Sequence, residues 1–254
     1  SSRLSETYPM ASHPDLRGVR CIVLGSTSGI GRATALALAA SGADVIVHGR
    51  RSEDAAASVA DECRRLGSPR SAVLMADLAD RAAGDQLVDR AWRLWEGLDA
   101  WLHLAGADTL TGEGAELDFD AKLDLLWAVD VSSTLRLCRR VGSLMMGWDQ
   151  AETGMEGDSG ELFAATTGAI MSLSRSLALS LAPEVRVNCL APGWIKTAWG
   201  EQASDEWHHR AVSEAPLARW GTPDDVAEVA RFLGGPAADF LTGPSVRITG
   251  GAVR

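Results

Sequence analysis

The chain has 254 residues, of which 23% are charged and 46% hydrophobic, and its formal net charge is −10 at pH 7. This length fits one α/β domain that can bury a core of its own. The acidic excess argues against nucleic acid or an anionic membrane surface as the main partner, because both call for a basic surface.

The sequence has no apolar run that approaches the length of a membrane span, and its N-terminus lacks the charged-then-apolar form of a signal peptide. We therefore expect a cytoplasmic protein without a membrane partner. The four cysteines are scattered, with no C-x-x-C pair, so buried thiols are expected rather than a metal site or disulfides. The opening segment is polar and carries two prolines, which predicts a flexible tail over 1–15 and a single domain over 16–254.

From residue 19 onward, apolar runs alternate with amphipathic stretches, which is typical of repeated βαβ units. The pattern predicts an α/β protein with a doubly wound parallel sheet, the Rossmann fold. The expected strands are residues 21–24, 43–47, 72–75, 100–104, 144–146, 185–190 and 245–248. The expected helices are residues 31–41, about 52–66, 81–95, 117–141, 163–181 and about 222–233. Ser52 and Thr222 are the expected N-caps of two of these helices.

Two segments are expected to be loops at the carboxyl edge of the sheet. Residues 147–160 are rich in Gly, Asp and Glu and follow the expected fifth strand, where catalytic groups gather in α/β sheets. Residues 194–207 form a Trp-bearing loop or lid. Its tryptophans either line an apolar pocket or pack the segment onto the body; they are Trp194, Trp199 and Trp207.

Three glycines separate the first expected strand from the first expected helix, in the spacing G-x-x-x-G-x-G at Gly25, Gly29 and Gly31. Without a Cβ at these positions, backbone N–H groups and a helix N-terminus can face an anionic phosphate. Such turns in α/β proteins are also often only turns. The cofactor site is expected here.

The second expected strand runs into Arg50 and Arg51 instead of an acidic residue. Folds that prefer NAD(H) usually place an acid near this strand end for the ribose hydroxyls, whereas guanidinium groups suit a 2′-phosphate. The pair favours NADP(H) over NAD(H). The alternative is a solvated turn in which arginine serves solubility.

Taken with the glycine turn, four further segments resemble the short-chain dehydrogenase/reductase family in order and spacing. They are Asp77-Leu78, the run from Val185 through Asn188 and Pro192-Gly193 to Thr197, the run from Arg219 to Ala227, and Gly250-Gly251. The resemblance covers nearly the whole chain after the tail and implies an oxidoreductase. By this resemblance and the charge pattern, the cofactor site comprises Gly25, Thr27, Ser28, Gly29, Ile30, Gly31, Arg50, Arg51, Asp77, Leu78, Ala105, Gly106, Pro192, Gly193, Ile195 and Thr197. Asp77 and Leu78 would border the adenine, and the Ile195 backbone with the Thr197 hydroxyl would hold the nicotinamide carboxamide.

The chain departs from the family at the catalytic positions. Phe163 and Thr167 stand where the family has a Tyr-x-x-x-Lys pair, and the chain has no other candidate for the pair, since its one tyrosine is Tyr8 and its lysines are Lys122 and Lys196. The family's serine position falls on Asp149 or Gln150, and its asparagine position on or near Ser132. A phenyl ring cannot protonate the oxygen that hydride transfer to a carbonyl leaves charged.

Three interpretations remain open. In the first, Asp149 beside Trp148 and Phe163 donates the proton and Gln150 binds the substrate oxygen, although Asp149 can equally cap its own loop. His103 is a further candidate by chemistry. In the second, the substrate is an iminium, an activated alkene or a compound that supplies its own proton. In the third, the chain is a catalytically inactive NADP(H)-binding sensor or scaffold.

The remaining acidic residues of the 147–160 region form a solvated rim or bind a cationic or polyhydroxylated small molecule; they are Glu152, Asp158 and the adjoining Glu161. The family resemblance also implies a homo-oligomer, a tetramer or dimer built on the helices 117–141 and 163–181. Their wide apolar faces agree, although core packing alone also produces such faces.

Overall fold

The computed structural model describes residues 15–110, 112–145, 151–153 and 161–252. Its centre is a seven-stranded sheet in the order β3-β2-β1-β4-β5-β6-β7, in which every pair is parallel. The strands are β1 (Arg20–Leu24), β2 (Asp44–Gly49), β3 (Ser71–Met75), β4 (Ala100–His103), β5 (Ala151–Thr153), β6 (Val187–Pro192) and β7 (Ser245–Ile248). The predicted doubly wound fold is confirmed.

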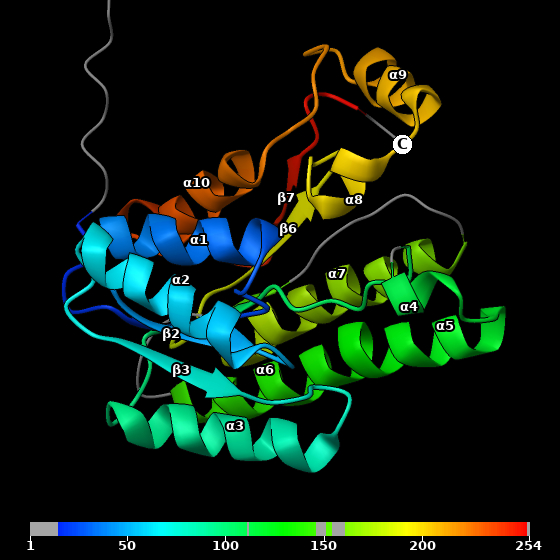
Figure 1. The fold of residues 1–254 in the computed structure, drawn as a ribbon. Helices are drawn as coiled ribbons and strands as arrows, with labels where there is room; N and C mark the ends of the chain where they lie inside the picture. The colour runs from blue at the N-terminus through cyan, green and yellow to red at the C-terminus, as the bar shows by residue number, and fades with distance from the viewer. Residues whose placement is uncertain (1–14, 111, 146–150, 154–160, 253–254) are drawn as a thin grey trace, which may run out of the picture.

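Helices cover both faces of the sheet, as Figure 1 shows. One face carries α1 (Gly29–Ala40), α2 (Glu53–Leu66) and α10 (Pro223–Leu233), and the other carries α3 (Arg81–Leu94), α6 (Ser133–Met145) and α7 (Glu161–Leu181). Because side chains alternate along a strand, β1 sends Cys21 and Val23 into the first core and Ile22 and Leu24 into the second. The strands are apolar on both faces for this reason, as parallel strands are.

The expected fifth strand at residues 144–146 is wrong. Leu144 and Met145 end α6, and Met145 is fully buried in the second core. The fifth strand of the sheet is instead β5, in which Ala151 pairs with both Trp101 and Val187. The expected loop over 147–160 therefore contains a strand.

The long helix expected over 117–141 is interrupted. It is α5 (Phe119–Leu126), then a π-helical turn η1 (Trp127–Ser132), then α6. The expected loop over 194–207 is also partly helical, with α8 (Ala198–Gln202) and the start of α9 (Asp205–Glu214). Two short helices complete the description: α4 (Gly112–Ala115) and the 3-10 turn η2 (Pro236–Ala238).

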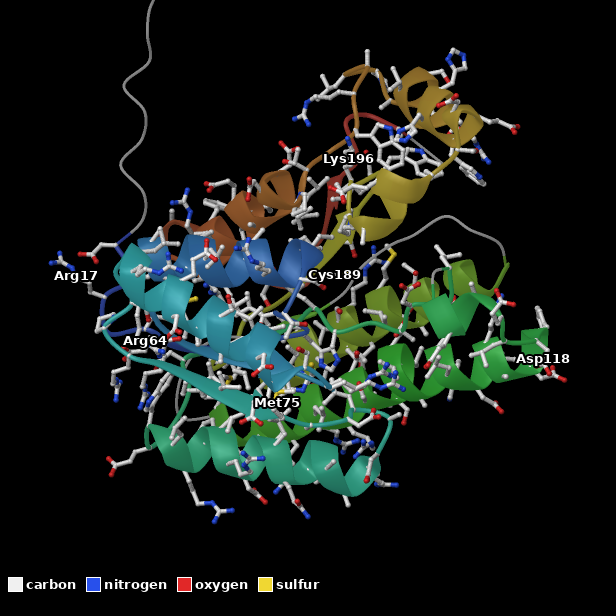
Figure 2. The ribbon with its side chains drawn as sticks, viewed as in Figure 1. Arg17, Arg64, Met75, Asp118, Cys189 and Lys196 are labelled. Carbon is white, nitrogen blue, oxygen red and sulfur yellow. The ribbon has the colours of Figure 1, made fainter. Side chains whose placement is uncertain are left out.

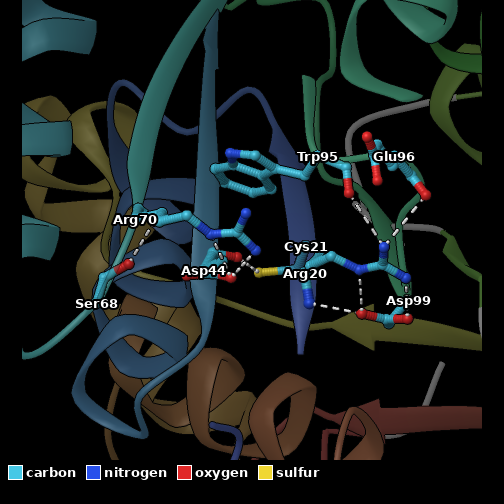
Figure 3. Close-up of polar contacts among 8 residues, drawn as sticks. All are labelled: Arg20, Cys21, Asp44, Ser68, Arg70, Trp95, Glu96 and Asp99. Atoms are coloured by element: carbon cyan, nitrogen blue, oxygen red, sulfur yellow. Dashed lines mark hydrogen bonds and ion pairs between the residues drawn. The ribbon is translucent and has the colours of Figure 1, made fainter. Parts of the chain in front are cut away.

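Ion pairs connect the amino ends of neighbouring strands, at the end of the sheet opposite the glycine turn; Figure 3 shows these contacts. Arg20 at the start of β1 forms a two-pronged pair with Asp99 just before β4, with both N···O distances 2.8 Å. Arg70 before β3 donates to the buried Asp44 at the start of β2 and lies over the Trp95 ring. These contacts hold four strands in register at one edge, so that their other ends are aligned for the site.

The predicted caps are confirmed: the Ser52 hydroxyl accepts from Ala55 N–H, and Thr222 forms a capping box with Asp225. All four cysteines are buried free thiols. None of the described helices combines the length and apolar character that a membrane crossing requires.

Candidate functional site

The glycine turn lies between β1 and α1, against the end of β4. Gly25 has φ +73°, and a Cβ there would stand 2.7 Å from the Ala105 Cα and 3.0 Å from the Leu104 carbonyl oxygen. A Cβ on Gly31 would stand 2.3 Å from the Gly25 carbonyl oxygen. The turn therefore tolerates only glycine at these two positions, and its backbone is brought close to the β4 end.

The N-terminus of α1 is open. Its N-cap residue Ser28 makes no side-chain capping bond, and the first turn has no acidic residue. By contrast, α2, α3, α5 and α10 all have capped N-termini. Uncapped N–H groups and the positive end of the helix dipole are features that bind an anion.

His48 and Ser26 anchor this turn on β2. Gly25 N–H donates to His48 Nδ1 at 3.1 Å, and His48 N–H donates to the Ser26 hydroxyl at 2.9 Å. His48 Nε2 lies 3.2 Å from the Ala76 carbonyl oxygen, so the ring is neutral with its proton on Nε2. Burial lowers the pKa of His48 to about 4, against the opposing effects of the Ala76 carbonyl and Asp77.

Arg50 and Arg51 follow β2 directly and are exposed, and Arg51 pairs with the exposed Glu113 at 3.3 Å. An exposed pair of this kind contributes little to stability, so it does not prevent the Arg51 guanidinium from binding a phosphate. Thr27 packs beside the strand end, since a Cβ on Gly49 would meet its methyl at 2.8 Å. Met75, the last residue of β3, lies at the same edge (Figure 2).

Asp77 and Leu78 follow β3. Asp77 is exposed and its carboxylate accepts from Ala79 N–H at 3.0 Å, whereas Leu78 is buried in the second core. Leu78 therefore offers little exposed surface, while the Asp77 side chain reaches solvent. Ile30 is likewise buried, in the first core, and supports the turn from beneath.

An acidic group on η1 that the sequence pattern did not reveal contacts the segment after β4. Asp130 Oδ1, on η1, accepts from Ala107 N–H at 2.8 Å, and it lies 3.7 Å from the Cβ position of Gly106. Burial raises the pKa of Asp130 to about 7, and the Ala107 N–H opposes the shift. The signal in the sequence is a lone carboxylate between two apolar residues of a helix, Val129 and Val131.

Ser132, the predicted asparagine position, ends η1 and is half-buried. Its neighbour Ser133 is buried, with its hydroxyl 3.3 Å from His103 Nε2. Burial lowers the pKa of His103 to about 3, so this histidine is a neutral core residue and a poor proton donor. The catalytic interpretation of His103 is not supported.

Positions 163 and 167 lie one turn apart on α7, on the same side of the helix. Thr167 is buried and α7 packs against η1. The Phe163 side chain, Asp149 and Gln150 lie outside the described residues, as do Trp148, Asp158 and the side chains of Glu152, Glu161 and Trp199.

The segment after β6 faces the glycine turn. Pro192 ends β6, and Gly193 packs closely on Thr249, where a Cβ would stand 2.9 Å from the Cα. Ile195 bridges to Gly221, which fixes the backbone that leads through Lys196 to Thr197 (Figure 2). Thr197 makes no side-chain cap for α8, and its Cγ2 lies 3.6 Å from the Cβ position of Gly29.

Three tryptophans pack α9 onto this segment. The Trp194 ring centroid lies 5.5 Å from that of Trp207 and 5.9 Å from that of Trp220. Trp194 Nε1 donates to Glu214 at 3.1 Å, and the Arg210 guanidinium, 4.9 Å from the Trp207 ring, pairs with the same carboxylate. For Trp194 and Trp207, the packing role is therefore the one that the contacts support.

These residues fit a dinucleotide. The close-packed Gly25 and Gly31 bring the backbone to the α1 N-terminus, which offers unused donors, and the segments 104–107 and 193–197 border the same turn. Within the described residues, no group of three or more His, Cys, Asp or Glu side chains is placed to hold a metal ion.

Comparison with known proteins agrees with this geometry. The family model described as enoyl-(acyl carrier protein) reductase matches residues 25–253. A 3-oxoacyl-(acyl-carrier-protein) reductase FabG from Aquifex aeolicus is 31% identical over 245 residues, or 93% of this chain and 98% of the relative.

Two solved structures are also similar. A short-chain dehydrogenase from Burkholderia cenocepacia J2315 in complex with NADP has a TM-score of 0.83 and 30% identity, covering 94% of this chain and 99% of the other. A 7α-hydroxysteroid dehydrogenase complexed with NADH and 7-oxo glycochenodeoxycholic acid has a TM-score of 0.83 and 27% identity, covering 94% and 95%.

The chain belongs to the short-chain dehydrogenase/reductase family of oxidoreductases. Members of this family bind nicotinamide cofactors, as the two ligand-bound relatives illustrate.

Proposed function

We propose that the protein is an NADP(H)-dependent oxidoreductase that reduces a C=O, C=N or activated C=C group of a small molecule at a non-standard active site. The observation that carries the proposal is the open α1 N-terminus beside a β2 end that continues into Arg50 and Arg51. Solved relatives with NADP and with NADH both exist, so the nucleotide choice depends on these local charges.

The bound cofactor supplies or accepts a hydride. The chain's own part is to hold it: the turn 25–31 faces the pyrophosphate, and Arg50 and Arg51 bind the 2′-phosphate. Asp77 and Leu78 border the adenine, and Ala105 and Gly106 line the cofactor. Ile195 and Thr197 hold the carboxamide, with Pro192 and Gly193 setting the course of that segment.

The proposed departure at α7 limits the chemistry. Neither a phenyl ring at 163 nor a buried threonine hydroxyl at 167 is an acid near neutral pH. The substrate oxygen or nitrogen must then be protonated by another group of the chain or by the substrate itself.

The test of cofactor choice is a titration of the protein with NADPH and, separately, with NADH, in which nicotinamide fluorescence reports binding. Replacing both Arg50 and Arg51 with Ala is expected to weaken NADPH binding by roughly 10- to 100-fold, because two charge-assisted contacts are lost, and to leave NADH binding within about threefold. The matched control is Arg65→Ala, at the far end of α2 and about 20 Å along that helix.

Equal loss for both nucleotides, or no loss, contradicts the assignment of NADP(H). Failure of the wild type to bind either nucleotide contradicts the proposed function. A turnover screen on ketones, imines and activated alkenes then separates the reductase from the alternative, an inactive NADP(H)-binding sensor or scaffold. Such a protein binds NADPH tightly but does not oxidise it, whichever of these substrates is added.

We also propose that the protein is a homo-oligomer assembled through α5, η1, α6 and α7. The supporting observation is the apolar surface that these elements leave exposed, at Phe119, Trp127, Leu135 and Leu144. Large exposed apolar side chains gathered on neighbouring helices are typical of an interface.

A further inference from the structure

Asp130 is a carboxyl group that neither the fold nor the proposed cofactor site explains. It lies within η1, between the buried Val129 and Val131, and its side chain is half-buried. The family resemblance assigns no acid here. Turns with the π-helical hydrogen-bond pattern are frequent at functional sites, because they displace one residue from the regular helix surface.

The position of Asp130 is fixed by the end of β4. Its Oδ1 accepts from Ala107 N–H at 2.8 Å, two residues beyond the Ala105 backbone on which Gly25 packs. The element that carries Asp130, η1, also packs against α7, where Thr167 is buried. The Ala107 bond places the carboxyl itself beside the segment that follows β4, at the carboxyl ends of the strands, where ligands bind.

Within the described residues, no cation forms an ion pair with Asp130. Lys122 of α5 donates to the Ala115 carbonyl, and Arg136 of α6 pairs with Asp85. The other charged or titratable groups on the elements around Asp130 are His103 at the end of β4, Asp108 in the segment after it, Asp120 and Asp124 on α5, Cys138, Arg139 and Arg140 on α6, and Glu161 and Arg175 on α7.

Burial, without a compensating cation, raises the pKa of Asp130 to about 7. Since Oδ1 accepts the Ala107 bond, the proton of the neutral acid is carried by Oδ2. A carboxylic acid with this property is matched to donate a proton near neutral pH.

We propose that Asp130 is the acid of this active site and that its Oδ2–H protonates the substrate during reduction. This inference rests on the proposed function. The substrate carbon gains a hydride from reduced nicotinamide, the π electron pair of C=O or C=N moves onto the heteroatom, and that atom takes the proton of Asp130. The carboxylate regains a proton from water.

The test compares the wild type with Asp130→Asn, which keeps the size of the side chain and an oxygen that accepts the Ala107 N–H. The matched control is Asp124→Asn, an exposed change on α5. Asp130→Asn is expected to bind NADPH within about threefold of wild type and to lower kcat by at least about 100-fold, the range for loss of a general acid.

A second readout needs no turnover. The free energy of unfolding of Asp130→Asn, relative to that of wild type, is expected to rise between pH 5 and pH 8. In this range the wild type is destabilised because the carboxyl ionises more readily in the unfolded state than in the folded state, and the variant has no such group. Parallel curves for the two proteins overturn the proposal, and so does an unchanged kcat. Should Asp130→Asn fail to fold, Asp130→Ser assayed with and without formate takes its place: recovery of turnover by the added acid is expected, and no recovery overturns the proposal.

The failures are distinguishable. Absence of NADPH binding by the wild type defeats the proposed function, while binding and turnover that survive in Asp130→Asn defeat only the role of Asp130. Binding without turnover of any ketone, imine or alkene by the wild type defeats both the reductase and its acid.

Discussion

At the scale of single residues, the two buried histidines and Asp130 have opposite effects on how the folding stability changes with pH. His48 uses both ring nitrogens, one toward Gly25 N–H and one toward the Ala76 carbonyl, and burial keeps it neutral. His103 is neutral for the same reason. Asp130, by contrast, favours the protonated form in the folded state.

We predict that folding stability falls as the pH drops from about 6.5 toward 4. The unfolded histidine binds a proton near pH 6.5, whereas folded His48 does so only near pH 4, so protonation favours unfolding in this window. Within this window, each pH unit changes the free energy of unfolding by about 1.4 kcal/mol for each such histidine. His48→Gln is expected to be less stable at pH 7.5 and to have a shallower pH dependence, measured by urea unfolding at pH 7.5, 6 and 5.

The control is His209→Gln, an exposed change on α9, which should preserve the wild-type slope. Identical slopes for His48→Gln and wild type would show that His48 is not held neutral by the fold.

The role of Asp130 could not be predicted from the sequence, although Asp130 itself was visible in it. A helix that places one carboxylate among apolar residues is ambiguous, because an amphipathic helix would turn that carboxylate to solvent. Here the π-helical turn and the Ala107 N–H, 23 residues earlier in the chain, bring it inward. The glycine turn was predictable because part of its constraint is local: Gly31 is required by the Gly25 carbonyl six residues earlier, whereas Gly25 is required by Ala105 at the end of another strand.

At the scale of elements, the join between β1 and α1 is the tightest part of the site. Gly31 contacts the Gly25 carbonyl, and Gly25 contacts the β4 end, so the three segments are packed backbone against backbone. Side-chain rearrangement cannot relieve a clash of this kind.

We predict that Gly31→Ala lowers NADPH affinity at least tenfold, because the added Cβ would have to displace the Gly25 carbonyl and with it the turn. Isothermal calorimetry or fluorescence titration measures this. Gly168→Ala on α7 is the matched control: its Cβ meets nothing within 4 Å, and alanine is expected to stabilise the helix by about 0.5–1 kcal/mol. Equal effects of the two substitutions on NADPH binding would contradict the tight-turn interpretation.

The strand wrongly expected at residues 144–146 and the unexpected strand β5 have one physical cause. β5 has only three residues, Ala-Glu-Thr, with no apolar run of its own, and its strand character comes from pairing with β4 and β6. Residues 144–146 supply the apolar run, but Met145 uses it to pack α6 on the second core. A period of two cannot be distinguished from a helical face over three residues.

At the scale of the whole molecule, the sheet divides two cores, and helices cover both of its faces (Figure 1). Among the described residues, both helix layers leave large apolar side chains in solvent: Leu66 and Phe232 on α2 and α10, and Phe119, Trp127, Leu135 and Leu144 on α5, η1 and α6. We propose assembly through the second side because its exposed side chains include two aromatic rings on consecutive elements, Phe119 and Trp127.

We predict that Leu135→Glu dissociates the oligomer. Leu135 is 41% exposed on α6, so the charge is tolerated by a single subunit, with a change in its stability of less than about 1 kcal/mol, but is buried unpaired in an interface. Sedimentation velocity measures the mass. Leu66→Glu, 45% exposed at the end of α2, is the control and should leave the mass unchanged. A wild type that sediments as a monomer would contradict the assembly.

The strand order has a consequence for how the protein folds during its synthesis. β1 is paired on one side with β4, and the glycine turn rests on Ala105 and faces Thr197 across the site. A chain leaving the ribosome at roughly 5–20 residues per second therefore exposes its glycine turn for on the order of 10 to 30 s before Thr197 is made. During that interval the proposed nucleotide site is incomplete. A nucleotide that binds as proposed can therefore stabilise the protein only near the end of synthesis, and the early strands depend on their own helices or on chaperones for protection.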